Sequence, residues 1–419
     1  MSSPKKLLSI LGPGLITGAS DDDPSGISTY GIAGASTGYS MLWVILLTTP
    51  MMSVIQGMCA RIAMVSGVGL AKAMRRRFPR WIVAPLAIAV IVANTINAGA
   101  DLEGMSAAAQ LLFGKPNLLW IALFGSILIV MQVYLSFHRF ASVVKWLTLA
   151  LFAYIVTAFV VRPPWGTVFR HLVLPEIHLH AIWLSTLVAV LGTTITPYLF
   201  FWQAALEVEE EEQEGRLTEE QRRGATREEI DDMHIDVNFG MIFSNLVAFF
   251  IIVTTAATLG AHGFHQITTA QDAARALEPL AGRFASWLFT AGMIGTGLLA
   301  IPAFTGSSAY ILSDAFGFRE GLNEKPSKAP QFYAILILGM LVAMAIGFLQ
   351  IDPISALFWS AVINGVVAVP LLAAIVFLAS DRRVMGRWVS SALARAWGWG
   401  TVVAMGVAAI AMFVFWGKA

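Results

Sequence analysis

The stretch SDDDPSGI, residues 20–27, places three aspartates, a proline and a glycine inside a segment that is otherwise largely apolar. Proline removes a backbone N–H donor and clashes with the preceding helical turn, and glycine permits backbone conformations outside the helical region. A helix that runs through this segment is therefore expected to open near Asp23, Pro24 and Gly26. The composition of the segments on both sides of this opening then indicates the class of protein.

Composition predicts that this break lies in a lipid bilayer. Of the 419 residues, 57% are hydrophobic and 13% are charged. Apolar runs of about 20 residues, enough to cross about 30 Å of hydrocarbon as helix, recur along the chain. We predict an all-α, polytopic membrane protein with a single transmembrane domain over residues 1–419. Eleven spans are expected, with centres near Gly18, Met52, Ala93, Ser126, Phe152, Thr194, Ala248, Thr296, Val342, Val366 and Val407.

Basic residues predict how the chain is oriented. They gather in loops that fall on one side of the membrane, and the positive-inside rule makes that side cytoplasmic. We expect a multi-pass protein of the cell membrane, in a bacterial inner membrane, with the N-terminus in the cytoplasm and the C-terminus outside. The basic residues are Lys5, Lys6, Lys72, Arg75, Arg76, Arg77, Arg80, His138, Arg139, Lys145, Arg319, Lys325, Lys328, Arg382, Arg383 and Arg387.

A strongly acidic segment, about residues 207–237, is predicted on the same cytoplasmic side. It begins EVEEEEQEG at Glu207 and ends at Asp236. Acidic residues contribute little to the positive-inside rule, so the segment does not alter the orientation. We interpret it as a solvated helical hairpin or loop. The alternative is a low-affinity surface or sensor that attracts cations.

A second break stands at the corresponding place in the other half of the chain. The apolar segment LVAVLGTTITPYLFFWQAAL, residues 187–206, is interrupted at Thr196, Pro197 and Tyr198. Paired interruptions of this kind are typical of transporters built from two inverted repeats, where the broken helices form the substrate site. We therefore expect both helices to open near the middle of the membrane.

The chemistry of the two breaks favours a cation. An unwound helix exposes backbone carbonyl oxygens, and carbonyls together with a carboxylate are ligands for hard cations. An aspartate inside a span costs about 2.5 to 3.5 kcal/mol on insertion scales, which indicates a function. Asp23 is the strongest candidate ligand. Asp21 and Asp22 are weaker, because neighbours on a helix point about 100° apart; Asp22 is a candidate vestibule acid.

At these residues the chain resembles the Nramp divalent-metal transporters, which carry Asp-Pro-Gly-Asn in span 1 and Met-Pro-His in span 6. GPGLITGA (residues 12–19), LLFG (111–114), LGTTITP (191–197) and QDAARALEPLAGRFASWLF (271–289) are similar to the family at corresponding places. The resemblance implies a leucine-transporter-type fold of five plus five inverted repeats with spans 1 and 6 unwound. The repeats would cover about residues 8–161 and 181–380, followed by an eleventh span at about 397–416.

Three of the four family motif positions have changed. The family aspartate falls on Asp23, but its asparagine falls on Gly26, its methionine on Thr196 and its histidine on Tyr198. A thioether favours transition metals, whereas a hydroxyl oxygen suits hard cations. Mg²⁺ keeps several waters when bound, so a wider site made only of oxygen atoms fits it. This pattern is similar to the Nramp-related magnesium transporters, a branch described as carrying Mg²⁺ and also Mn²⁺.

The resemblance also implies the remaining members of a metal site. The carbonyl of Thr193 matches the backbone ligand of span 6, and Gly26 offers space or a carbonyl. Tyr198 is included because it occupies the place of the histidine. Asn364 in span 10 lies near a polar position that faces the site in the family, although an interhelical hydrogen bond would also explain it.

Proton coupling is expected to be absent or weak. A phenol such as Tyr198 is a poor proton carrier at neutral pH. In span 3, Asp101 matches one acid of the family's pair while Ala98 replaces the other, and Glu103 is an extra acid. Asp101 and Glu103 are therefore possible relay acids, acids of an outer vestibule, or a structural pair.

We predict a transporter or uniporter that takes up Mg²⁺, with Mn²⁺ tolerated. The main alternative is a proton-coupled Mn²⁺ or Fe²⁺ importer of the classical Nramp type. An organic-substrate symporter, with Asp23 binding an amine, and a membrane sensor that does not transport are further alternatives. No enzymatic motif is found in a suitable setting. The expected partners are the divalent ion and the bilayer, with no cofactor, nucleic acid or obligatory protein partner.

Overall fold

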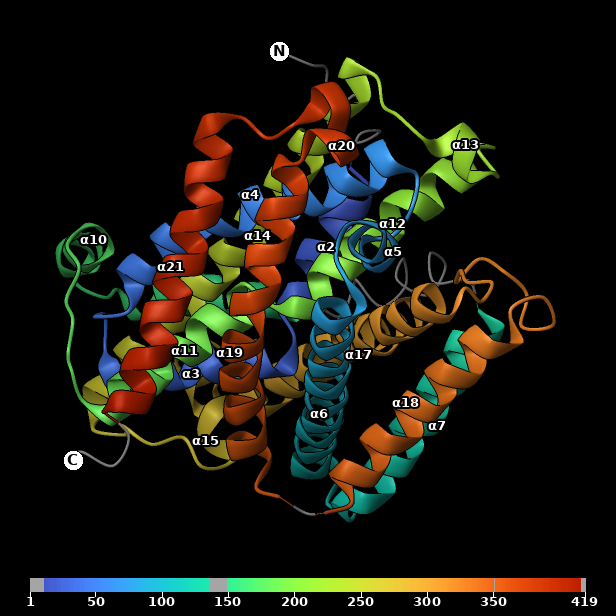
Figure 1. The fold of residues 1–419 in the computed structure, drawn as a ribbon. Helices are drawn as coiled ribbons and strands as arrows, with labels where there is room; N and C mark the ends of the chain where they lie inside the picture. Colours follow the sequence, from blue (N-terminus) through green and yellow to red (C-terminus); the bar gives the residue numbers. More distant parts are fainter. Residues whose placement is uncertain (1–10, 136–148, 350, 416–419) are drawn as a thin grey trace.

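A computed structural model of the chain describes residues 11–135, 149–349 and 351–415, and these residues form helices without a β-strand (Figure 1). Within this part of the chain, nine helical segments are long and apolar enough to cross a membrane. They contain α4 (Leu42–Ser66), α6 (Arg80–Phe113), α7 (Asn117–Tyr134), α11 (Ala181–Thr194) with α12 (Pro197–Gln213), α14 (Arg227–Thr258), α17 (Ala285–Phe316), α18 (Pro330–Gly347), α19 (Pro353–Ser380) and α21 (Ala392–Val414).

Shorter helices complete the fold. The first predicted span is divided into α2 (Pro13–Asp21) and α3 (Pro24–Thr37), and the described part of the fifth consists of η1 (Leu149–Leu151) and α9 (Phe152–Val161). All eleven predicted span centres lie in helices. The connecting helices are α5 (Leu70–Arg77), α10 (Trp165–Val173), α13 (Glu219–Arg222), η2 (Gly260–His262), α15 (Ala270–Ala274), η3 (Arg275–Leu277), α16 (Glu278–Ala281), η4 (Gly282–Phe284), α20 (Arg382–Met385) and η5 (Gly386–Trp388).

The predicted orientation and repeat boundaries stay predictions. Five of the basic residues that indicate orientation lie outside the described residues, namely Lys5, Lys6, His138, Arg139 and Lys145.

Both predicted helix breaks are confirmed. Helix α2 ends at Asp21 and α3 begins at Pro24, while α11 ends at Thr194 and α12 begins at Pro197. In a continuous helix the N–H four residues later would bond each carbonyl. Because proline has no N–H, the carbonyls of Ser20 and Thr193 lose that donor. Each break therefore places a freed carbonyl beside the start of a new helix.

Helices from the two halves of the chain pack against one another. Helix α14 contacts both α2 and α3, α12 contacts α4, and α19 contacts α3 and α6. Helices α2 and α14 approach through glycines, because a side chain on Gly14, Gly18 or Gly240 would overlap the backbone of the opposite helix. Small residues permit such backbone contact between membrane helices. On the periphery, α7 and α18 lie side by side (Figure 1).

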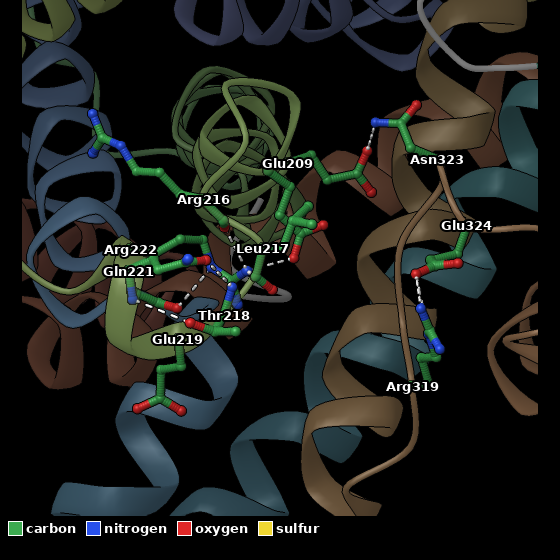
Figure 2. A network of polar contacts seen from close by, with 12 residues as sticks. Glu209, Arg216, Leu217, Thr218, Glu219, Gln221, Arg222, Arg319, Asn323 and Glu324 are labelled. Carbon is green, nitrogen blue, oxygen red and sulfur yellow. Dashed lines mark hydrogen bonds and ion pairs between the residues drawn. The ribbon is translucent and has the colours of Figure 1, made fainter.

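The acidic segment is helical, but its expected solvation is wrong for part of it. Helix α12 continues to Gln213, and Glu207, Glu209 and Glu211 within it are buried. Figure 2 shows Glu209 reaching Asn323, whose Nδ2 donates to Glu209 Oε2 at 2.6 Å. The Leu322 N–H also donates to Glu209, at 2.5 Å. Glu209 thus faces the loop after α17, while Glu207 and Glu211 line a cavity beside the start of α14. Tertiary packing therefore decides the exposure of these carboxylates.

Candidate metal site

The carboxylate of Asp23 lies at the break between α2 and α3 and caps the N-terminus of α3. Its Oδ1 accepts hydrogen bonds from the N–H of Gly26 at 2.5 Å and from Ser25 Oγ at 2.8 Å. Its Oδ2 accepts one from Asn97 Nδ2 at 3.3 Å. The residue is only 2% exposed. A carboxylate has about four lone-pair positions, so three hydrogen bonds leave capacity for a cation.

Polar side chains of α6 and α19 continue the cluster. Asn97 Oδ1 accepts a hydrogen bond from Asn364 Nδ2 at 3.1 Å, so Asn97 links Asn364 to Asp23. Asp101, one turn after Asn97 on α6, accepts the N–H of Ser25 at 3.2 Å through Oδ1. Sequence reasoning missed Asn97. Its position four residues before Asp101 puts both on one helix face, and that spacing was the available signal.

Several buried oxygen atoms of the candidate residues have no hydrogen-bond partner within the described part of the chain. They are Asp21 Oδ1, Thr193 Oγ1, Thr196 Oγ1, Asp101 Oδ2 and Asn364 Oδ1. Buried polar groups usually have a partner, and an exception calls for an explanation such as an ion or water. No three His, Cys, Asp or Glu side chains of the described residues are grouped closely enough to hold a metal. A metal site here therefore needs hydroxyl, amide or carbonyl oxygens, or water, besides the carboxylates.

Gly26 lies where the two broken helices meet. A Cβ at this position would be 3.2 Å from Asp23 Oδ1 and 3.3 Å from Thr193 Oγ1. The absence of a side chain thus lets oxygens from both breaks approach the same backbone. These oxygens already fill the nearest space beside Gly26, and the predicted room for a hydrated ion stays a prediction.

Tyr198 connects the two breaks. Its hydroxyl donates to the carbonyl oxygen of Ser20 at 2.6 Å, which is the carbonyl freed by Pro24. The ring packs against Phe304 with centroids 4.0 Å apart. The phenol therefore replaces the missing backbone donor at the end of α2. Its predicted membership of the metal ligand set is not tested by this contact.

Asp21 and Asp22 share a hydrogen-bond partner that differs from those of Asp23. Ser244 Oγ on α14 lies 2.6 Å from Asp21 Oδ2 and 3.2 Å from Asp22 Oδ1, and both aspartates are buried. Ser244 was not singled out from the sequence. Glu103 is 2% exposed, and the structure shows no hydrogen bond between it and the cluster residues described above. Asp101 and Glu103 are two residues apart, which points them to different sides of α6.

Asp236 of α14 fixes the other end of α2. Its carboxylate accepts the N–H groups of Gly12, Gly14 and Leu15 at 3.0, 2.6 and 3.0 Å. Because the first N–H groups of a helix have no partner within it, this carboxylate acts as a cap from a distant helix. Helix α2 is thus held at one end by Asp236 and at the other by Tyr198.

Replacing Tyr198 with phenylalanine tests the link between the breaks. The ring stays, but the Ser20 carbonyl becomes a buried acceptor without its donor, which costs about 1 to 3 kcal/mol. We expect Tyr198→Phe to lower the thermal unfolding temperature of the purified protein. The matched control is Tyr134→Phe, because Tyr134 is 80% exposed. Equal unfolding temperatures for the two variants would show that the hydroxyl does not support the fold.

Comparison with known proteins places this architecture in a family. The Nramp model, described as natural resistance-associated macrophage protein-like, matches residues 14–415. The divalent metal cation transporter MntH of Deinococcus radiodurans is 27% identical over 426 residues, which cover 98% of this chain and 90% of that protein. MntH of Ralstonia nicotianae is 30% identical over 326 residues, covering 74% of this chain and 70% of that protein.

Solved structures confirm the predicted leucine-transporter-type fold. A crystal structure of the Eremococcus coleocola manganese transporter matches with a TM-score of 0.75 and 20% identity, covering 98% of this chain and 86% of that one. Mhp1, a nucleobase-cation-symport-1 family transporter, matches in a closed conformation with a TM-score of 0.60 and 14% identity, covering 97% of this chain and 90% of that one. The model match over almost the whole sequence and this shared architecture lead to one conclusion: the chain belongs to the Nramp family.

Proposed function

We propose that this protein carries divalent metal cations across a membrane, with Mg²⁺ as its main substrate and Mn²⁺ also accepted. The observation that carries the proposal is the buried Asp23 carboxylate at the meeting point of two broken helices, with unpartnered oxygens on Thr193, Thr196 and Asn364. A cation at this point would compensate the buried negative charge of Asp23 and would give those oxygens the partner that they lack among the described residues. The family match supports a transporter and not an enzyme.

The donor set supports a hard cation. The unpartnered candidate atoms are hydroxyl, amide and carboxylate oxygens. Mg²⁺ binds such oxygens in an octahedron and retains waters, so one carboxylate with a few neutral oxygens is a suitable site. Thr196 stands at the N-cap of α12, where a thioether would give affinity for softer metals.

The alternative is a proton-coupled Mn²⁺ or Fe²⁺ importer of the classical Nramp type. The solved manganese transporter of the same fold favours Mn²⁺, and the relatives described as divalent metal cation transporters are compatible with either ion. Against this alternative, the site presents Thr196 and Tyr198 in place of a thioether and an imidazole. Relative affinities for Mg²⁺ and Mn²⁺ therefore distinguish the two proposals.

We further propose transport with weak or absent proton coupling. The Tyr198 hydroxyl is committed to the Ser20 carbonyl, which leaves it without an obvious role as a proton carrier. The membrane potential alone can drive uptake, because two charges that cross 100 mV gain about 4.6 kcal/mol. The proposed orientation has the N-terminus in the cytoplasm and the C-terminus outside, in a bacterial inner membrane.

Uptake of Mg²⁺ and Mn²⁺ into liposomes that contain the purified protein tests the function. Asp23→Asn keeps the size of the side chain but removes the charge, and we expect uptake of both ions to fall at least about tenfold. The control is Asp231→Asn, whose side chain is 67% exposed on α14. Absence of Mg²⁺ uptake by the unaltered protein, or full uptake by Asp23→Asn, would refute the proposal.

Thr196→Met tests whether residue 196 controls selectivity. A thioether in place of the hydroxyl adds a soft ligand, so we expect the ratio of Mn²⁺ to Mg²⁺ uptake to rise about tenfold. Thr196→Ser, which keeps the hydroxyl, is the matched control and should leave the ratio near its original value. An unchanged ratio in an active Thr196→Met protein would exclude this role.

A pH-sensitive dye inside the same liposomes tests coupling. With an inward Mg²⁺ gradient and a clamped membrane potential, we expect metal uptake without matching acidification of the lumen. Empty liposomes and liposomes with Asp23→Asn define the background leak of protons. Acidification that follows metal uptake in a fixed ratio would instead support the classical coupled importer.

A further inference from the structure

A large basic cavity lies away from the metal site, on the side predicted to be cytoplasmic. Its volume is about 770 Å³, and five of its fourteen lining residues are arginines, while none is acidic. Its walls come from the end of α4, from α5, from the linker between α13 and α14, and from α20 with η5. We call this cavity the arginine pocket. Its arginines are Arg76, Arg77, Arg223, Arg383 and Arg387.

Three of these arginines share two carboxylates outside the cavity. Arg76 donates to both oxygens of Glu219 at 2.7 Å, and Arg223 donates to Glu219 at 3.0 Å. Arg77 pairs with Asp381. The hydrogen bond from Arg76 lowers the pKa of Glu219 to about 2, and that from Arg77 lowers the pKa of Asp381, so both acids are ionised at neutral pH. Five guanidinium groups against two carboxylates leave three positive charges.

Arg383 and Arg387 supply two of these three charges, and the third arises because Arg76 and Arg223 share Glu219. Neither Arg383 nor Arg387 forms an ion pair with any residue that the structure describes. The Arg387 guanidinium stacks over the Trp388 ring, 5.0 Å from its centroid. Behind the wall, Arg61 is 9% exposed and donates to Ser390 Oγ at 2.6 Å, but its Nε has no partner among the described residues. Arg61 lies one turn before Val65 of the cavity wall.

The walls of the cavity are joined by hydrogen bonds. The N–H of Gly224 donates to the carbonyl of Val65 at 3.1 Å, which fixes the linker against the end of α4. Arg222 Nε donates to the carbonyl of Gly67 at 3.2 Å. The cavity is therefore formed by the fold itself and needs no ligand to assemble it. Its volume falls within the range of about 300 to 1,000 Å³ that is usual for sites of small ligands.

We propose that the arginine pocket binds a phosphate ester, supplied by the headgroup of an anionic phospholipid. Guanidinium groups bind phosphate oxygens through paired hydrogen bonds, and basic pockets between membrane helices on the cytoplasmic side suit such headgroups. Trp388, Val384 and Met385 supply an aromatic and apolar lining next to the charges, which fits a lipid better than a soluble anion. This site is independent of the metal site and of the proposed function.

Binding of lipid to the purified protein tests the proposal. Native mass spectrometry would count bound molecules after titration with phosphatidylglycerol or with phosphatidylcholine as the neutral lipid. A double variant, Arg383→Gln with Arg387→Gln, removes two arginines that hold no ion pair, so the fold is expected to persist. The matched control is Arg382→Gln with Arg395→Gln, which removes two exposed arginines that do not line the cavity. Unfolding temperatures would confirm that all three proteins are folded.

We expect phosphatidylglycerol to bind in preference to phosphatidylcholine, and the Arg383 and Arg387 double variant to weaken it about tenfold to thirtyfold. The control variant should bind as the unaltered protein does. In a second arm, inorganic phosphate and ATP are added as competitors of the bound lipid. If they displace it while the two lipids bind equally well, the ligand is a soluble phosphate ester, and the assignment to a lipid headgroup is overturned. Equal binding of both lipids without competition, or equal weakening by the control, would overturn the proposal.

Discussion

The structure depends on two helix breaks, at Pro24 and Pro197, where a helical hydrogen bond cannot form. Proline has no N–H, so the carbonyls of Ser20 and Thr193 lose their helical donors at points where the chain passes through the apolar core. Lipid supplies no replacement, and each freed group must be satisfied by protein, water or an ion. The protein therefore surrounds both breaks with polar side chains drawn from several helices. The polar centre is a consequence of the two prolines.

The oxygen atoms at the two breaks differ in their hydrogen-bond partners. The Ser20 carbonyl receives the hydroxyl of Tyr198, so the first break obtains a protein donor. At the second break, the hydroxyl oxygens of Thr193 and Thr196 have no hydrogen-bond partner among the residues that the structure describes. Acceptors that no donor satisfies are suited to a positive ion, and Asp23 contributes the charge. Both breaks thus contribute to the candidate site: the first supplies the Asp23 carboxylate, and the second supplies the hydroxyl oxygens of Thr193 and Thr196.

The sequence predicted what depends on local chemistry. A proline located each break, the apolar runs gave eleven expected span centres that all lie in helices, and a charge in an apolar span singled out Asp23. It did not predict Asn97 or Ser244 as partners of the aspartates, because these contacts join helices separated by 74 and 223 residues and depend on how the helices pack. Burial of Glu207, Glu209 and Glu211 was missed for the same reason: a run of glutamates is typical of a solvated surface until another helix covers it.

The cap on α2 also limits the order in which the protein can mature. The N–H groups of Gly12, Gly14 and Leu15 bond to Asp236, more than 220 residues later in the chain. During synthesis the ribosome must produce more than half of the polypeptide before this carboxylate exists. Helix α2, the first helix among the described residues, therefore cannot receive this cap until α14 has been made.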